Sequence, residues 1–379
     1  MTDTPSNRGF SLKDQLFNVD KVRYLGGLFT SAKFDAEMFE AKVMETLLDL
    51  ELTPRITLIA TVLESFLPED FSLAAMAIEE AIPAPLDPDK TDDDFGDFIF
   101  APLGEYIVRN GMGAANLSTS LPLLRELTKR FSVEFSIRHF LNTWPEETLA
   151  AMREWAHDEN YHVRRLVSEG TRPTLPWGKK VGLGTDDTLP FLDILHADQT
   201  RFVTRSVANH MNDISKKQPD LVVEILTKWR DLGRQDAAEM DWMIRHATRT
   251  LVKKGHAGAL AMLGFHDSPE IEVSEIVLSP ADHLVIGDVG AFSFEITAKR
   301  DENLMVDYVI DFVKKNGSSA PKVFKLKKLE MKKGQTVRVE KKHRFLKGAT
   351  TFTHYAGEHR FNLQINGNIL GAKKFTLTD

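Results

Sequence analysis

A spacing of 40 residues in the middle of the chain most constrains its fold. The segment Asp158–Val167 aligns with Asp198–Val207, and a shorter third copy lies at Met243–Ala247. This spacing places three arginines at equivalent positions, Arg165, Arg205 and Arg245. A period of about 40 residues is typical of HEAT-type solenoids, in which each repeat is a pair of helices. Chance alignment of three short helices is the alternative interpretation.

The apolar residues from about Leu12 to Leu263 mostly follow the helical period. Pro145 is placed to begin one helix, with two glutamates in its first turn. The aspartate that opens each of the first two repeat copies is expected to cap the second helix of its pair. The stretch Pro83–Gly96 is rich in Pro and Asp and predicts a long surface loop. We therefore expect an all-α HEAT-like repeat solenoid over residues 1–265.

After Gly264 the pattern changes to the alternation that is typical of β-strands. The pair Asn366-Gly367 favours a two-residue hairpin turn before Ile369. Roughly 110 residues with some seven short strands predict an immunoglobulin-like β-sandwich over residues 266–379. The clearest alternating segments are Ile271–Val277, Phe292–Thr297, Met305–Ile310, Thr336–Glu340 and Arg360–Ile365.

The net charge of −7 conceals a strong asymmetry. Residues 312–379 hold 16 Lys and Arg against four Asp and Glu, so they carry +12 and the rest of the chain carries −19. A basic segment of this kind favours an anionic partner such as DNA, whose phosphates release counterions on binding. Lysines that protect exposed strand edges from pairing are the alternative interpretation of the same charges.

Several classes of protein are excluded or disfavoured by what the sequence lacks. There is no cysteine, which excludes disulfides and thiolate metal sites and fits a reducing compartment. The HExxH, Walker and GxGxxG motifs are also missing. No apolar run reaches the ~18 residues of a membrane helix, and the segment Met1–Gly9 lacks the apolar core of a signal peptide. We expect a cytoplasmic protein with no metal, no cofactor and no membrane partner.

Trp177 differs from the other four tryptophans because it lies in a loop. Pro176 precedes it, and Gly178, Lys179 and Lys180 follow it. A large aromatic ring beside glycine and two lysines is suited to stacking on a sugar or a base. Packing within the loop is the alternative, and the sequence does not decide between the two.

Arginines and acids alternate along equivalent helix faces. Arg165 and Glu169 are four residues apart, and Arg205 and Asp213 share the corresponding face one repeat later. Salt bridges on a solvated face are one interpretation. In the other, the arginines hold phosphates while the carboxylates face a developing cation.

Glu134 belongs to a helix that is otherwise largely apolar, with Phe131, Phe135 and Phe140 around it. A buried carboxylate without a partner costs several kcal/mol. The simplest expectation is a buried pair with Arg138, one helical turn further on.

Three stretches together resemble the AlkC branch of the AlkC/AlkD DNA-alkylation repair proteins. They are the Glu134–Arg138 helix, the run Val163–Pro173 leading into Pro176-Trp177-Gly178, and Ser206–Asp213. Ordinary HEAT proteins lack the Glu-Gly-x-Arg-Pro loop with its following tryptophan. The motifs span roughly residues 130–215, and the helical pattern extends the likeness over about residues 1–265.

The resemblance implies a monofunctional glycosylase that removes 3-methyladenine and 3-methylcytosine from DNA, and some family members carry an added immunoglobulin-like domain. It also implies that Glu134, Glu169, Asp213 and Trp177 form the catalytic cluster. Carboxylates stabilise an oxocarbenium-like sugar and position water, while a tryptophan face attracts the cation. Most glycosylases flip their target base, whereas the resemblance suggests an open concave surface that bends the duplex.

The expected partner is therefore double-stranded DNA that contains alkylated bases, bound by a monomer. We expect its phosphates to be contacted by basic residues of both domains, namely Arg165, Arg172, Lys179, Lys180, Arg205, Arg245, Lys327, Lys328, Lys332 and Lys333.

Two other functions remain open at this point. A non-catalytic helical-repeat scaffold, whose immunoglobulin-like domain binds protein, would show a large apolar patch on the concave face in place of arginines and carboxylates. A glycoside hydrolase acting on sugars is disfavoured because no sugar-stacking aromatic residues accompany the carboxylates.

Overall fold

The computed structural model describes residues 11–90, 95–280, 282–348 and 352–379. The chain divides into two compact units. The first comprises Met1–Ile214 and Leu232–Met243, and the second comprises Ser215–Asp231 and Ile244–Asp379. The predicted fold class, a helical-repeat domain followed by a β-sandwich, is confirmed. No helix among the described residues is long and apolar enough to span a bilayer.

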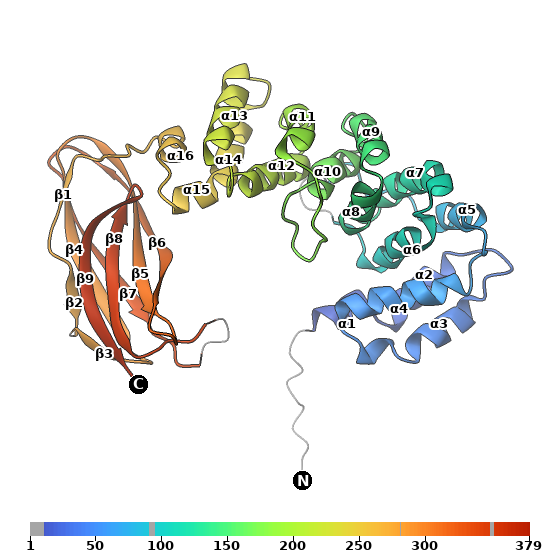
Figure 1. The fold of residues 1–379 in the computed structure, drawn as a ribbon, viewed down its shortest axis with the longest axis horizontal. Helices are drawn as coiled ribbons and strands as arrows, with labels where there is room; N and C mark the ends of the chain where they lie inside the picture. Colours follow the sequence, from blue (N-terminus) through green and yellow to red (C-terminus); the bar gives the residue numbers. More distant parts are fainter. Residues whose placement is uncertain (1–10, 91–94, 281, 349–351) are drawn as a thin grey trace, which may run out of the picture. The chain divides into compact units, whose positions relative to one another are not determined.

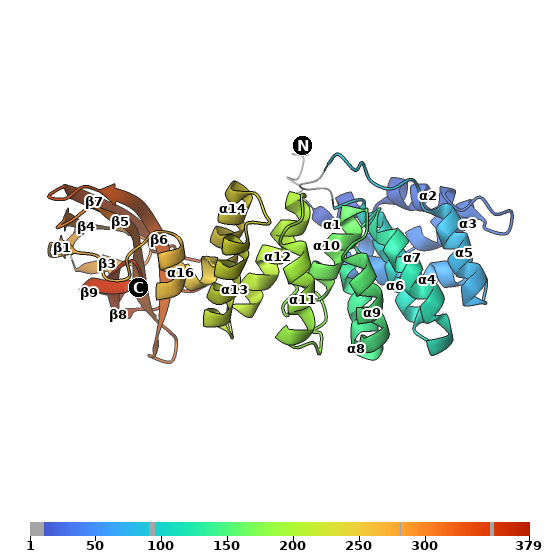
Figure 2. The ribbon, with the colours of Figure 1, turned by 90° about the horizontal axis from the view of Figure 1, so that it is seen from above.

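The first unit is built from helices, most of which Figure 1 shows in blue to green. Helices α4, α6, α8, α10 and α12 each pack on the next member of this series, so they form a continuous row. Figure 2 shows the later pairs side by side from above. The bounds are α1 Leu12–Leu16, α2 Val19–Gly27, α3 Ala36–Met44, α4 Leu52–Glu64, α5 Phe71–Ala81, α6 Ala101–Gly111, α7 Leu117–Thr128, α8 Glu134–Thr143, α9 Pro145–Trp155, α10 Tyr161–Gly170, α11 Thr185–Leu195 and α12 Arg201–Ile214.

The 40-residue spacing corresponds to helix pairs, as predicted. The aligned arginines lie on α10, α12 and α14 (Ala237–Ala247), each of which is the second helix of its pair. Helices also contribute to the second unit, namely α13 (Pro219–Leu232) as far as Asp231, α14 from Ile244 onward, α15 (Arg249–Lys253) and α16 (Ala257–Met262). Pro145 begins α9, as its position in the sequence indicates.

Asp158, at the start of the first repeat copy, joins neighbouring helix pairs instead of capping its own helix. The cap of α10 is Asn160, whose side chain accepts a hydrogen bond from the backbone of His162 at 2.9 Å. Asp158 instead accepts from Arg125 of the preceding pair, with Nε–Oδ2 at 2.6 Å. Arg164 and Asp198 repeat this contact one pair later, at 2.5 Å. The prediction of an aspartate cap was wrong for α10, because the carboxylate of Asp158 binds Arg125 of the preceding helix pair.

The second unit contains a sandwich of two sheets. A four-stranded sheet has the order β1-β4-β2, with β7 paired to β4, and a five-stranded sheet has the order β3-β9-β8-β5-β6. All the pairings are antiparallel except that of β3 with β9. The bounds are β1 Ile271–Val273, β2 Val277–Ser279, β3 His283–Val285, β4 Val289–Ala298, β5 Glu302–Val313, β6 Ser319–Met331, β7 Thr336–Arg344, β8 Gly357–Ile365 and β9 Asn368–Thr378.

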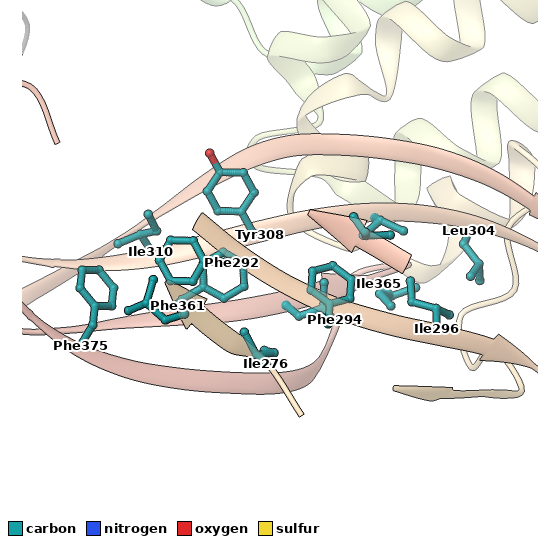
Figure 3. Close-up of a cluster of buried hydrophobic side chains, with 14 of the residues drawn as sticks. Ile276, Phe292, Phe294, Ile296, Leu304, Tyr308, Ile310, Phe361, Ile365 and Phe375 are labelled. Atoms are coloured by element: carbon teal, nitrogen blue, oxygen red, sulfur yellow. The ribbon is translucent and has the colours of Figure 1, made fainter. Parts of the chain in front are cut away.

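Aromatic rings from both sheets fill the core of the sandwich (Figure 3). Phe292 of β4 stacks on Phe361 of β8 with ring centroids 4.0 Å apart, so this contact joins the two sheets. Asn366 and Gly367 connect β8 to β9 with φ of 46° and 86°. Both values are positive, as a two-residue hairpin turn requires, which confirms the turn predicted from the Asn-Gly pair.

Candidate active site

Three carboxylates meet because their helices are successive members of the row in the first unit. Glu134 is the first residue of α8, Glu169 is next to last in α10, and Asp213 is next to last in α12. Since α8 packs on α10 and α10 packs on α12, residues far apart in the sequence come together. The row of helices therefore brings together the three carboxylates of the cluster that the family resemblance implies.

Glu134 is held by Arg165 and not by Arg138. Arg165 Nη1 donates to Glu134 Oε2 at 2.9 Å and to Ser132 Oγ at the same distance. The hydroxyl of Ser132 in turn donates to Glu134 Oε2 at 2.5 Å. The predicted pair with Arg138 is wrong, because the buried partner comes from the neighbouring helix.

Glu169 and Asp213 share one guanidinium. Arg172 Nη1 donates to Glu169 Oε1 at 2.6 Å, and its Nε and Nη2 lie 3.0 and 2.9 Å from Asp213 Oδ2. Arg165 Nη2 lies 3.8 Å from Glu169 Oε2, so the two arginines link all three carboxylates. Ser206 Oγ completes the shell of Glu169 with a hydrogen bond of 2.6 Å. Glu169 and Asp213 are each only 5% exposed.

The electrostatic environment keeps Glu169 ionised. Burial opposes its ionisation, but the charges of Arg165 and Arg172 and the hydrogen bond from Ser206 outweigh burial, so the pKa of Glu169 lies below its ordinary value. Arg172 behaves in the complementary way. Burial disfavours its charge, but Glu169 and Asp213 outweigh that effect and raise the pKa of Arg172.

Arg138 instead anchors the loop that carries Trp177. Its guanidinium is fully buried, and Nη1 donates to the carbonyls of Gly170 and Arg172 at 2.9 Å. Its Nε donates to the carbonyl of Lys179. Three carbonyls at the two ends of the loop are thus tied to α8, which fixes the loop against the cluster.

Trp177 projects into solvent from this loop. Its side chain is 85% exposed, so packing within the loop does not explain the residue. Its φ is 61°, a left-handed conformation that residues other than glycine rarely adopt. Figure 1 shows the loop between α10 and α11 extending away from both helices. A strained backbone that presents an exposed aromatic ring is typical of a functional position.

The predicted DNA contacts fall into three groups by their exposure to solvent. Arg165 and Arg172 are buried against carboxylates, which corrects their assignment to phosphates: they hold the acids in place. Arg205 is half-buried on α12. The others are exposed, with Lys179 and Lys180 beside Trp177, Arg245 on α14, Lys327 and Lys328 on β6, and Lys332 and Lys333 in the turn before β7.

Some members of the cluster were not predicted from the sequence. Ser132 and Ser206 bond directly to the carboxylates, and the Phe202 ring lies 4.3 Å below the guanidinium carbon of Arg165. Charge patterns miss all three because the residues are uncharged. Ser206 stands within a stretch that carries the AlkC resemblance, which was the available signal. Among the described residues no group of three or more His, Cys, Asp or Glu side chains is arranged so that it could hold a metal ion.

Comparison with known proteins identifies relatives over both parts of the chain. Residues 120–251 match the family described as "DNA alkylation repair enzyme". Residues 272–379 match the family described as "Uncharacterised protein YhaZ, C-terminal Ig-like domain". The chain is 37% identical to the Bacillus subtilis (strain 168) protein YhaZ over 274 residues, which is 72% of this chain and 74% of that protein.

A solved structure resembles the chain along almost its whole length. It is the alkylpurine DNA glycosylase AlkC of Pseudomonas fluorescens, bound to DNA that contains an abasic site analog. The match has a TM-score of 0.83 and 31% identity, and it covers 98% of this chain and 100% of the other.

Proposed function

Because the chain belongs to the DNA alkylation repair enzyme family, we propose that it is a DNA glycosylase for cationic alkylated bases in duplex DNA, 3-methyladenine and 3-methylcytosine among them. The observation that carries this proposal is the cluster of Glu134, Glu169 and Asp213, joined by two buried arginines; the loop that follows Glu169 also presents an exposed tryptophan. The similar AlkC structure holds DNA with an abasic site analog, which is the kind of DNA that base removal leaves.

The reaction that suits this cluster is hydrolysis of the N-glycosidic bond. The bond between C1′ and the base nitrogen breaks, and its electron pair neutralises the positive charge of the alkylated ring. Positive charge then develops on the sugar, where ionised carboxylates stabilise it. Water forms the new bond to C1′ and gives its proton to a carboxylate. The products are a neutral free base and an abasic deoxyribose.

Three carboxylates and two guanidiniums leave the cluster with a charge of −1 when all are ionised, so it attracts a cation. The charges of Arg165 and Arg172 let Glu169 remain ionised although it is buried. Within the described residues, Glu134 and Glu169 form their ion pairs with arginines and not with a lysine. This favours water over an amine as the nucleophile, and hence a monofunctional enzyme. Trp177 would lie against the alkylated nucleotide and add cation–π attraction.

DNA binding is assigned to the exposed cations. Lys179 and Lys180 flank Trp177 and would contact the strand that carries the lesion. Arg205 and Arg245 are proposed as further contacts, and the lysines of β6 and the following turn as non-specific contacts to phosphates. In this proposal a monomer acts in the cytoplasm without a metal or a cofactor. The arginine and carboxylate cluster favours this function over a protein-binding scaffold.

Base release tests the proposal. Purified protein is incubated with a duplex that contains a single 3-methyladenine or 3-methylcytosine, and free base and abasic sites are quantified, with the undamaged duplex as control. We expect release of the methylated base and no strand cleavage until the abasic site is treated with alkali. A rate equal to spontaneous base release for both lesions would reject the proposal.

A further inference from the structure

A pocket of about 380 Å³ lies in the first unit beside the Trp177 loop. Its walls come from α4, α6 and α8, and the segment Trp177–Lys179 forms one side. The volume lies within the range of ~300–1,000 Å³ that is usual for small-ligand sites. The three carboxylates do not line it, so the pocket is a separate cavity beside the cluster.

The lining is mainly aromatic and aliphatic. Phe98, Phe131 and Phe135 supply aromatic surface and Val108 and Ile56 supply aliphatic surface. Charged side chains also line the pocket: Glu105, Arg109 and Lys179. Flat apolar walls favour a planar ring over a flexible ligand.

Two polar groups in the pocket have no partner within the described residues. Ser136 is only 9% exposed and its hydroxyl makes no hydrogen bond there. His139, half-buried on the same helix, likewise makes none, and burial together with Lys179 lowers its pKa, so it is neutral at pH 7. The hydroxyl of Ser136 offers a ligand one donor and one acceptor. The neutral imidazole of His139 likewise offers a ligand one donor and one acceptor.

The pocket adjoins the cluster through Ser132, which lines it and donates to Glu134 Oε2 at 2.5 Å. One side chain therefore separates the site of bond cleavage from the cavity. Trp177 also lines the pocket. A base that passes from the cluster into the pocket would therefore contact Trp177.

We propose that this pocket binds the free alkylated base after its release, with Ser136 and His139 bonding the edge of the ring. The inference rests on the proposed function and adds a product site to it. Cleavage converts a cationic base into a neutral one. The cation is attracted by the carboxylates, whereas an apolar cavity accepts a neutral ring without the cost of desolvating a charge. The change of charge thus favours transfer from the cluster to the pocket.

Binding is measured on the full chain without DNA by titrating free 3-methyladenine and recording tryptophan fluorescence. We expect a saturable change that is absent in Trp177→Phe, because Trp177 borders the pocket. Ser136→Ala should weaken binding about five- to tenfold through the loss of one hydrogen bond. Val108→Phe should weaken it more by filling the cavity. Ile194→Phe, on the surface of α11, is the matched control and should bind as the wild type does.

Single-turnover excision separates this inference from the proposed function. We expect Ser136→Ala and Val108→Phe to excise within about twofold of the wild-type rate and to lose inhibition by added 3-methyladenine. No saturable fluorescence change in the wild type would overturn the product site while leaving excision intact. A parallel loss of binding and of single-turnover excision in both variants would also overturn it, because the pocket would then act before the bond breaks.

Discussion

Replacing Arg172 by methionine removes the guanidinium that lies between Glu169 and Asp213. All three side chains are at most 10% exposed, and the contacts are 2.6 to 3.0 Å long. Methionine has a comparable length but no charge, so two carboxylates are deprived of their shared partner inside the protein. Breaking a buried ion pair in this way costs about 3–5 kcal/mol of unfolding free energy.

The destabilisation should depend on pH in a defined direction. Because the wild-type pKa of Glu169 is depressed, its pairing contributes stability that is present above the unfolded value near 4.5 and is lost as pH falls through the folded value. In Arg172→Met, Glu169 loses one of its two guanidinium partners and binds a proton more readily. The difference between wild type and variant should therefore be full at pH 8 and shrink at pH 4.

Urea unfolding followed by tryptophan fluorescence measures this difference, because all five tryptophans lie in the helical part of the chain and none in the strands. The control is Arg23→Met, which removes an exposed pair with Glu40 and should change stability far less, because exposed pairs contribute little. A destabilisation by Arg172→Met that matches this control, or one of equal size at pH 8 and pH 4, would refute the account of the cluster.

Three other perturbations have defined outcomes. Trp177→Ala should slow excision while the melting temperature stays within a few degrees of wild type, since the ring is 85% exposed; a cooperative loss of folding would contradict this. Burial lowers the pKa of His210 to about 4 from 6.5, so the unfolded chain binds a proton that the native chain does not. This should remove about 2 kcal/mol of stability between pH 7 and pH 5, and His210→Leu should lack that component in urea titrations. Changing Lys327, Lys328, Lys332 and Lys333 to glutamate in the full chain should weaken DNA binding and reduce its salt slope by about 0.9 for each phosphate that is no longer neutralised; an unchanged slope would assign these lysines to solubility alone.

The architecture could be predicted from the sequence because the helical part and the strand part each show a characteristic periodic pattern. The arginines spaced by 40 residues mark the second helices of the pairs, and the alternation after Gly264 marks the strands. Asn366-Gly367 identified a turn from two residues, since few pairs accept positive φ at both positions. These features are local or periodic, and such features are visible in one sequence.

The partners inside the cluster could not be found in the same way. Reasoning along one helix assigned Glu134 to Arg138, but its partner is Arg165, 31 positions away on the next helix of the row. Arg165 and Arg172 were assigned to phosphates because their charge was known and their burial was not. Which side of a helix meets its neighbour is decided by packing across the solenoid, and this determines whether an arginine binds an acid or DNA.

The rate of a single turnover on 3-methyladenine DNA tests the central claim most directly. Glu134→Gln, Glu169→Gln and Asp213→Asn remove one negative charge each with little change of shape. The account predicts that at least one of these variants excises about tenfold more slowly or worse, which corresponds to roughly 1.4 kcal/mol of barrier, while its affinity for the duplex is largely kept. Equal rates for the wild type and all three variants would contradict the assignment of these carboxylates to catalysis.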